Sequence, residues 1–372
     1  MSKKVKFKTI FDFCSKSKIK ASEGLPNGDF PFYTSSQNLS KFINEANFRD
    51  TEALIFGTGG LASIHYANTS FSTSTDCFVT KLKNNDFFLK YIYYYLSGNI
   101  YILENGFKGA GLKHISKKYM EDIEIPFTSF EQQKQIAKTL DKANELMELR
   151  KESITKLDAL AKSIFIDMFG DPVSNPKDWE IKKLRELTSK IGSGSTPRGG
   201  KDSYKEEGIS LIRSLNIHDN RFKYKDLALI DDLQAKSLAN VIVEENDVLL
   251  NITGASVCRC AIVPTNVLPA RVNQHVAIIR TIENLNPNFL LHLFISSYKL
   301  KLLNLASSGG ATREALTKEN LELLEIIVPP LELQNKFAKV IEKIEEQKTL
   351  YTQELEKLQI NFDALLQKSF QE

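Results

Sequence analysis

Apolar residues recur at alternating spacings of four and three positions in two separate stretches of the chain. A shift of 201 residues lays the first stretch on the second without a gap, beginning with Ile136 on Phe337. The matched positions are Ile136, Leu140, Ala143, Ile154, Leu157, Ala161 and Ile164 in the first stretch and Phe337, Ile341, Ile344, Leu355, Leu358, Phe362 and Leu365 in the second. Such a heptad seam is typical of a coiled coil, and unrelated helices on separate cores would not share one register. The pattern therefore predicts two long helices that pack on each other.

The repeat continues outside the two helices. Three further pairs of segments match in order: VKFKTIFDF from Val5 with WEIKKLREL from Trp179, ALIFGTGG from Ala53 with VLLNITGA from Val248, and IEIPFTSFEQQ from Ile123 with LEIIVPPLELQ from Leu324. The second pair reads as an apolar strand that ends in a polar glycine turn. The stretch GDPVSNPKDW, which begins at Gly170, carries two prolines and ends the first helix.

These matches predict an α+β protein with a pseudo-twofold internal repeat. Two globular α/β domains are expected over 1–129 and 171–330, and they are separated by long helices over 130–170 and 331–372. Because each helix must lead back to the other globular domain, the two helices are expected to form an antiparallel coiled coil. The two globular domains would then lie at opposite ends of a rod.

Composition and charge narrow the class of protein only slightly. The formal net charge of the 372 residues is +3, which is too small to establish a nucleic-acid partner, although the globular parts carry the surplus. The opening MSKKVKFKTI has no uninterrupted apolar core, and no run of about 18 apolar residues occurs, so a soluble cytoplasmic protein is expected. The four cysteines form no CxxC pair and find no histidine at zinc-finger spacing, which predicts buried or idle thiols and no metal site.

Catalytic motifs are weak or missing. NPNF at Asn286 resembles the Asn-Pro-Pro-aromatic turn with which amino-methyltransferases hold the target amine, but Asn288 stands at its third position, and a helix N-cap explains the segment. FGTGG at Phe56 does not have GxGxxG spacing, and no Walker loop, HExxH or GxSxG motif occurs. The sequence therefore predicts no catalytic, cofactor-binding or metal-binding residues and a chain that is not an enzyme by itself.

Polar loops at the ends of predicted strands are the candidates for ligand contact. They are rich in Gly, Ser, Thr, Asn, Gln and Arg, whose side chains or close-approaching backbone read base edges and phosphates; Arg suits guanine, and Asn or Gln suits adenine. A merely flexible surface loop remains the alternative for GSGSTPRGGK, from Gly192 to Lys201. The candidate DNA-binding residues of the first globular domain are Tyr33, Thr34, Ser35, Ser36, Gln37, Thr58, Gly59, Gly60, Lys108, Gly109, Lys113 and His114. Those of the second are Ser193, Ser195, Thr196, Arg198, Lys201, Arg213, Asn216, Thr253, Gly254, Ser256, Arg271, Asn273, Gln274, His275, Ser308, Gly309, Thr312 and Arg313.

The chain resembles the specificity subunits of type I restriction-modification systems over nearly its whole length. The segments that carry the resemblance are GDPVSNPKDWEIKKL, the GSTP loop, DVLLNITGA, the SSGG loop and IIVPPLELQNKFA leading into a long helix. The resemblance implies that each globular domain is a target-recognition domain for one half of a split, asymmetric site in double-stranded DNA. It also implies that the helices set the spacing and dock two methyltransferase subunits. Those partners would hold S-adenosylmethionine, and restriction/translocase subunits can join.

One departure from this family and two other classes of function stay open at this point. The first globular domain lacks a GSTP loop and is shorter, 1–129 against 171–330, so the transfer of contacts onto it is less secure. A self-contained DNA methyltransferase or nuclease would act on DNA without partners, which a labelled methyl donor and the purified chain would test. A protein-binding scaffold with two globular heads would give no salt-dependent shift of DNA.

Overall fold

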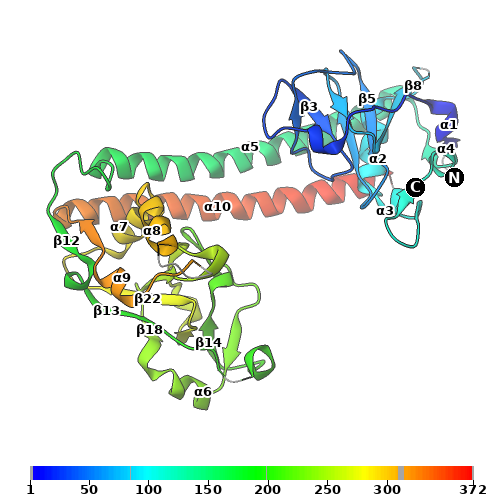
Figure 1. Ribbon diagram of the computed structural model, residues 1–372. Coiled ribbons are helices and arrows are strands. Elements are labelled where there is room, and N and C mark those ends of the chain that lie inside the picture. The colour runs from blue at the N-terminus through cyan, green and yellow to red at the C-terminus, as the bar shows by residue number, and fades with distance from the viewer. Residues whose placement is uncertain (1–2, 84, 198, 309–313, 371–372) are drawn as a thin grey trace. The chain divides into compact units, whose positions relative to one another are not determined.

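The computed structural model describes residues 3–83, 85–197, 199–308 and 314–370 (Figure 1). The chain forms two compact units: unit 1 is Met1–Glu152 with Thr352–Glu372, and unit 2 is Ser153–Tyr351. Both predicted long helices are present, α5 (Phe130–Phe169) and α10 (Leu331–Phe370), each of 40 residues. Each of these helices contributes one half to unit 1 and the other half to unit 2.

Unit 1 is built on a four-stranded antiparallel sheet with the strand order β2-β8-β5-β6, next to a smaller sheet β4-β3-β7. Its strands are β1 (Lys4–Lys6), β2 (Phe11–Phe13), β3 (Phe30–Tyr33), β4 (Phe42–Ile43), β5 (Ala53–Gly57), β6 (Ile64–Ala67), β7 (Ser72–Thr73), β8 (Cys77–Leu82), β9 (Phe107–Lys108), β10 (His114–Ile115) and β11 (Glu124–Pro126). Besides α5 its α-helices are α1 (Phe7–Ile10), α2 (Leu89–Gly98), α3 (Tyr101–Glu104) and α4 (Lys117–Glu121). Strand β5 is buried at all five positions and forms the centre of this unit.

Unit 2 repeats this plan with a four-stranded sheet in the order β13-β22-β19-β20 and a second sheet β17-β14-β21-β18. Its strands are β12 (Ile181–Lys183), β13 (Thr188–Ser193), β14 (Ile209–Ile212), β15 (Ile217–His218), β16 (Arg221–Phe222), β17 (Ala228–Ile230), β18 (Ile242–Val243), β19 (Val248–Asn251), β20 (Cys260–Ile262), β21 (Ala270–Val272), β22 (Val276–Thr281) and β23 (Glu325–Ile327). Besides α10 its α-helices are α6 (Asp232–Ser237), α7 (Pro287–Ile295), α8 (Tyr298–Ser307) and α9 (Lys318–Glu322).

The strand pairing confirms the internal repeat. In unit 1 the hairpin β5–β6 is followed by β8, which pairs with β5, and β2 pairs with β8. In unit 2 the hairpin β19–β20 is followed by β22, which pairs with β19, and β13 pairs with β22. The parallel pair β3–β7 corresponds to β14–β21, and the antiparallel pair β1–β11 corresponds to β12–β23. The same order of connections therefore occurs twice in one chain.

Unit 2 has elements between β14 and β19 for which the described part of unit 1 has no equivalent. These are the hairpin β15–β16, helix α6 and strand β18. The turn of the hairpin is tied to α10, because Asn220 Nδ2 donates a hydrogen bond to Glu345 Oε1 at 2.8 Å. Asn220 has a positive φ of 51°, a conformation that asparagine tolerates better than most residues. The greater length of the second half is thus used partly to hold its sheets against the long helix.

The two long helices run antiparallel within each unit, as the order of domains and helices along the chain predicts. In unit 1, Ala137 and Leu140 of α5 pack with Phe362 and Leu365 near the end of α10. In unit 2, Phe337 near the start of α10 packs edge-on against Phe165 and Phe169 near the end of α5, with ring centres 5.6 and 5.3 Å apart. Figure 1 draws α5 in green and α10 in red.

Ion pairs replace apolar contacts toward the middle of both helices. Arg150 pairs with Glu354 at 2.7 Å in unit 1, and Lys348 pairs with Asp158 at 2.7 Å in unit 2. The seam is therefore apolar near the ends of the two helices and polar at Arg150 and Lys348.

A buried glutamine ties the first turn of each long helix to its unit. Gln334 is fully buried; its Oε1 accepts from Asn286 N at 2.9 Å, and its Nε2 donates to Pro329 O at 2.8 Å and to Asn284 O at 3.3 Å. Gln133 makes the same three bonds in unit 1, to Phe88 N, Thr128 O and Asp86 O. The side chains satisfy backbone groups that burial would otherwise leave without a partner.

The four cysteines are free thiols, of which Cys77, Cys258 and Cys260 are buried and Cys14 is half-buried. Burial raises the pKa of Cys77 to about 11 and that of Cys258 to about 12, so both are protonated at neutral pH. No helix within the described residues is long and apolar enough to cross a membrane.

Candidate nucleic-acid interface

Three of the predicted polar loops of unit 2 meet at one end of the strands in the sheet β13-β22-β19-β20. Thr253 follows β19, Gln274 and His275 connect β21 to β22, and Thr196 follows β13. Thr253 Oγ1 and His275 Nδ1 form a hydrogen-bonded pair at 2.5 Å, Gln274 Nε2 lies 3.2 Å from His275 Nε2, and Thr196 Oγ1 donates to Gln274 Oε1. Four candidate residues from three separate loops therefore form one connected chain.

This chain of hydrogen bonds fixes which groups can face a ligand. An amide nitrogen only donates, so the contact from Gln274 makes His275 Nε2 the acceptor and places the ring proton on Nδ1. Thr253 Oγ1 then accepts from Nδ1, and its own hydroxyl hydrogen remains available. Gln274, which is exposed, keeps one N–H and one carbonyl lone pair for an outside partner.

A pocket of about 640 Å³ lies beside these residues. Of the predicted residues it is lined by Thr253, Gly254, Ser256 and His275. Gly254 has a φ of 74°, which an L side chain rarely adopts, so the turn after β19 requires glycine. Ser214, Glu314 and Ala315 also line the pocket, and so do Leu215, Ala255 and Arg259, which the sequence patterns did not single out.

The floor of this region is fixed by Asn251, another residue that the sequence did not indicate. Its side chain is fully buried, and its Nδ2 donates to Ser214 O at 2.9 Å and to Ser256 Oγ at 3.2 Å. It therefore joins two loops that line the pocket. A polar residue at the end of the otherwise apolar strand VLLN was the available signal. The Asn251 Oδ1 is buried without a hydrogen-bond partner among the described residues.

Arg259 contributes positive charge to the pocket, and further cations lie close to it. The pKa of His218 is lowered by partial burial and then by the neighbouring charges of Arg259, Arg221 and Lys223. His218 lies in β15 and Arg221 in β16, Lys223 directly follows β16, and Arg259 directly precedes β20. A cluster of cations beside a polar pocket suits the phosphate backbone of a nucleic acid.

The structure corrects two of the predicted contacts in unit 2. Asn216 is fully buried and its Nδ2 donates to Lys223 O at 2.9 Å, so it shapes the loop and does not reach a ligand. Asn273 is buried, and its Oδ1 accepts from His275 N at 3.1 Å. Arg271 is half-buried, with Nε donating to Ala235 O at 3.2 Å and Nη1 donating to Ala270 O at 2.9 Å.

The other predicted residues of unit 2 differ in how far their side chains are exposed. Arg213 is half-buried, and its guanidinium stacks over Tyr204 at 5.0 Å from the ring centre and donates to Asp226 O. Ser195, Lys201 and Ser308 are exposed, and Ser193 is half-buried at the end of β13. Arg198, Gly309, Thr312 and Arg313 lie outside the described residues.

Unit 1 brings its glycine turn and its last loop together in the corresponding place. Gly59 bridges to His114, Gly60 N donates to Lys113 O at 3.2 Å, and His114 Nδ1 lies 3.1 Å from Thr58 O. In unit 2, Thr253 bridges to Ala315 in the same way. Lys108, Gly109, Lys113 and His114 are exposed, so this loop presents polar and basic groups to solvent.

The segment from Tyr33 to Gln37 is divided between core and surface. Ser36 and Gln37 are exposed, Thr34 and Ser35 are half-buried, and Gln37 Nε2 donates to Ala62 O at 3.1 Å. Tyr33 is only 8% exposed, and its ring packs edge-on against Phe71 at 5.6 Å between centres. Burial raises the pKa of Tyr33. Tyr33 and the buried side chain of Thr58 therefore belong to the core, which corrects their predicted role as direct contacts.

Taken together, the described loops can recognise a ligand through hydrogen bonds and charge. They present amide, hydroxyl and imidazole groups whose directions are fixed by neighbouring bonds. Within the described part of the chain, no group of three or more His, Cys, Asp or Glu side chains could hold a metal ion.

Comparison with known proteins places this arrangement in context. A family model described as the type I restriction modification DNA specificity domain matches residues 2–159 and 176–359. The putative MjaX specificity subunit of Methanocaldococcus jannaschii is 26% identical over 251 residues, which cover 62% of this chain and 55% of that protein. The MjaVIII specificity subunit of the same organism is 24% identical over 327 residues, which cover 82% of this chain and 76% of that protein. The EcoBI specificity subunit of Escherichia coli is 23% identical over 291 residues, 68% of this chain and 58% of that protein.

Solved structures share the fold. The S subunit of a type I restriction-modification system from M. genitalium aligns over 100% of this chain and 96% of its own, with a TM-score of 0.65 and 17% identity. A chain from a study of complex assembly and conformational transition of the type I R-M system aligns over 99% of this chain and 97% of its own, with a TM-score of 0.56.

Proposed function

The chain belongs to the type I restriction modification DNA specificity family, and on that basis we propose that it is the DNA-reading subunit of a type I restriction-modification complex. Residues 1–129 and 171–330 are the two target-recognition domains, and each reads one half of a bipartite, asymmetric site in double-stranded DNA. The subunit is non-catalytic. It acts in the cytoplasm, where its partners and DNA are found.

The observation that carries this proposal is the repeated meeting of polar loops at the same point of a repeated fold. In both units the turn after the central strand, β5 or β19, bridges to the last loop before α4 or α9. The framework is repeated but the loop side chains are not, since unit 1 presents Lys113 and His114 where unit 2 presents Glu314 and Ala315. Different side chains on one framework read different base sequences, so the two half-sites differ.

Gln274 is the best placed base reader in unit 2. Its remaining N–H and carbonyl lone pair match the N7 and N6 groups that adenine presents in the major groove, an arrangement worth about 1–3 kcal/mol of discrimination. Thr196 and His275 hold its amide in one orientation. Arg259, Lys201 and the basic residues of β15 and β16 supply phosphate contacts, which position the domain without specifying sequence.

The long helices set the distance between the two half-sites and dock the partners. Residues 130–170 and 331–372 serve these roles, and two methyltransferase subunits bind along them. Large apolar side chains remain exposed on both helices, including Leu146 (45%), Leu160 (46%), Leu350 (53%) and Ile360 (67%). Exposed apolar side chains along a helix suit a helical partner. The methyltransferase subunits hold S-adenosylmethionine and carry out adenine methylation, and restriction/translocase subunits join the same complex.

The decisive experiment expresses this chain with its methyltransferase subunits and maps methylated adenines by single-molecule sequencing. The expected result is one interrupted, asymmetric motif that requires this chain. Exchange of residues 1–129 for the equivalent part of another specificity subunit should change one half of the motif only. A change in both halves would contradict the division between the domains. Loss of salt-dependent DNA binding in the assembled complex would instead favour a protein-binding scaffold.

A further inference from the structure

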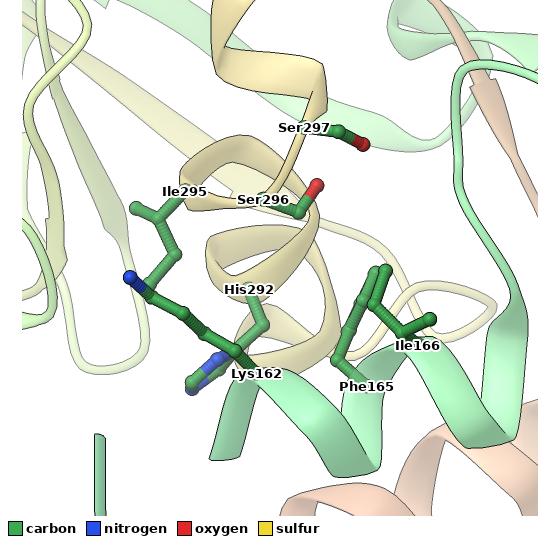
Figure 2. A pocket seen from close by; sticks show the side chains of 7 residues that line it. All are labelled: Lys162, Phe165, Ile166, His292, Ile295, Ser296 and Ser297. Atoms are coloured by element: carbon green, nitrogen blue, oxygen red, sulfur yellow. The ribbon is translucent and has the colours of Figure 1, made fainter. Parts of the chain in front are cut away.

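Unit 2 contains a pocket that is separate from the polar loops. It has a volume of about 330 Å³ and lies between the last turns of α5 and the α7–α8 connection (Figure 2). Phe165, Ile166 and Ile295 supply most of its apolar lining, and Lys162 and His292 are its basic groups. A pocket of this size is at the lower end of the range for small-molecule sites, and it would hold a ligand with about one aromatic ring.

His292 is the unusual residue in this pocket. It is 3% exposed, and its ring meets Phe337 edge-on at 5.2 Å between centres. Its Nε2 is buried and has no hydrogen-bond partner among the described residues. Burial lowers the pKa of His292 to about 4, so the imidazole is neutral at neutral pH. A buried polar atom of this kind is destabilising unless something outside the chain completes its bond.

The remaining polar groups at the pocket leave one unpaired cation. Ser296 Oγ donates to Leu293 O at 2.6 Å, and Ser297 Oγ donates to Asp171 Oδ1 at 2.7 Å, so both hydroxyl hydrogens are used. Val173 N also donates to the carboxylate of Asp171, at 2.9 Å. Lys162 is exposed and forms no ion pair within the part of the chain that the structure describes. The Lys162 ammonium and the His292 nitrogen are thus the groups left for a ligand.

The equivalent place in unit 1 carries different side chains. Phe88 and Asn286, which directly precede α2 and α7, are equivalent residues, because the backbone N–H of each donates to a buried glutamine. Tyr94 follows Phe88 by the same number of residues as His292 follows Asn286, so Tyr94 is the counterpart of His292. The Tyr94 hydroxyl is satisfied, because it donates to Asp141 Oδ1 at 2.8 Å.

The wall beside Tyr94 differs as well. A Cβ on Gly98 would lie 2.4 Å from Leu366 Cδ2, and the shift of 201 residues lays Phe165 on Leu366. Gly98 and Leu366 therefore meet in unit 1 where Ser296 and Phe165 line the pocket of unit 2. Two copies of one partner would require equivalent binding surfaces in both units, and the different side chains at this position do not fit that role.

We propose that this pocket binds a small amphipathic carboxylate, with an aromatic or branched aliphatic body among Phe165, Ile166 and Ile295. The carboxylate accepts a hydrogen bond from His292 Nε2–H and pairs with the Lys162 ammonium. The neighbouring cation Lys348 adds little, because Asp158 and Glu345 already pair with it at 2.7 and 3.0 Å. This site is independent of DNA reading, and its occupation would hold α7 against α5.

The test uses three matched probes and the full chain in its assembled complex. Benzoate supplies both the ring and the charge, benzyl alcohol supplies the ring without the charge, and acetate supplies the charge without the ring. Affinity is measured by calorimetry, and the side-chain nitrogen signals of His292 are followed by NMR. Benzoate should bind most tightly of the three and shift Nε2. Equal binding of benzoate and benzyl alcohol would overturn the assignment, and so would the absence of any shift at His292.

Three variants complete the design. Lys162→Gln should weaken benzoate about fivefold and leave benzyl alcohol unchanged, since an exposed ion pair is worth up to about 1 kcal/mol. His292→Tyr copies Tyr94 of unit 1 and should abolish binding of both ring probes. Lys339→Gln, which removes an exposed charge of α10 outside the pocket, should change neither. If His292→Tyr blocks assembly with the methyltransferase while benzoate never binds, the pocket belongs to a protein partner and the proposal is wrong. DNA binding by each variant, measured in parallel, separates this result from the proposed function.

Discussion

Replacement of Gln334 by methionine should loosen the second long helix from its unit. Methionine has a similar length and flexibility but neither donates nor accepts a strong hydrogen bond. The change therefore removes the bonds at 2.9, 2.8 and 3.3 Å to Asn286 N, Pro329 O and Asn284 O without removing much volume. Because Gln334 is fully buried, water cannot reach these backbone groups unless the helix start moves.

The expected loss follows from the number of backbone groups left without a partner. A buried unsatisfied donor or acceptor costs about 1–3 kcal/mol, and two of the three bonds are short enough to count fully. The free energy of unfolding of unit 2 should therefore fall by about 3 kcal/mol. For a unit of this size that corresponds to a melting temperature lower by roughly 6–12 °C. In the assembled complex, a loosened helix start should also make the number of base pairs between the two half-sites variable.

Calorimetry and urea unfolding of the full chain measure this effect, and the chain offers matched comparisons. Gln133→Met should destabilise unit 1 by a similar amount, because Gln133 makes the equivalent bonds. Gln132→Met changes a neighbouring exposed side chain and should alter the unfolding free energy by less than about 0.5 kcal/mol. A loss below about 1 kcal/mol for both buried glutamines would refute the argument that they hold the helices to their units.

Three further outcomes are expected. Burial lowers the pKa of His292 from 6.5 to about 4 in the folded chain, so the unfolded chain takes up this proton at a higher pH than the folded chain does. The stabilisation that is present above pH 6.5 is therefore lost as the pH falls toward 4. His292→Phe should flatten this pH dependence of the urea midpoint. Gln274→Ala should relax methylation specificity in one half-site by about 1–3 kcal/mol per base pair read without lowering the melting temperature, and relaxation in both halves would contradict it. Insertion of one heptad into both α5 and α10 should move the half-sites apart by about 10.5 Å, or roughly 3 bp, and an unchanged gap in the methylated motif would disprove the spacing role.

The long helices and the repeat could be predicted from the sequence because they depend on local periodicity. A heptad pattern reports which face of a helix is buried, whatever the rest of the chain does. The same pattern missed Gln133 and Gln334, since a polar residue ordinarily indicates a solvated position. Their occurrence at the same place in both halves was the available signal, because a repeated polar residue beside an apolar seam indicates a repeated buried bond.

The polar loops could be placed from the sequence, but the directions of their side chains could not. Thr253, Gln274 and His275 meet because the end of β19 lies beside the start of its antiparallel neighbour β22. Asn216 and Asn273 have the residue type that reads adenine, yet both are buried and satisfy backbone groups. Whether such a side chain faces solvent depends on which unsatisfied carbonyls surround it, and only the tertiary structure supplies them.

The division between framework and loops explains how one fold can acquire different targets. The turn after β5 or β19 is bound to the last loop through backbone bonds, such as Ile115 N to Thr58 O at 3.1 Å and Leu316 N to Ile252 O at 2.8 Å. Backbone bonds do not depend on the side chains beside them, so exposed loop residues can change without loss of the framework. Core groups such as Asn251 cannot change in this way, because their bonds hold two loops at once. Specificity should therefore be alterable at Gln274 and at Gln37, and it should be lost together with stability when Asn251 is replaced.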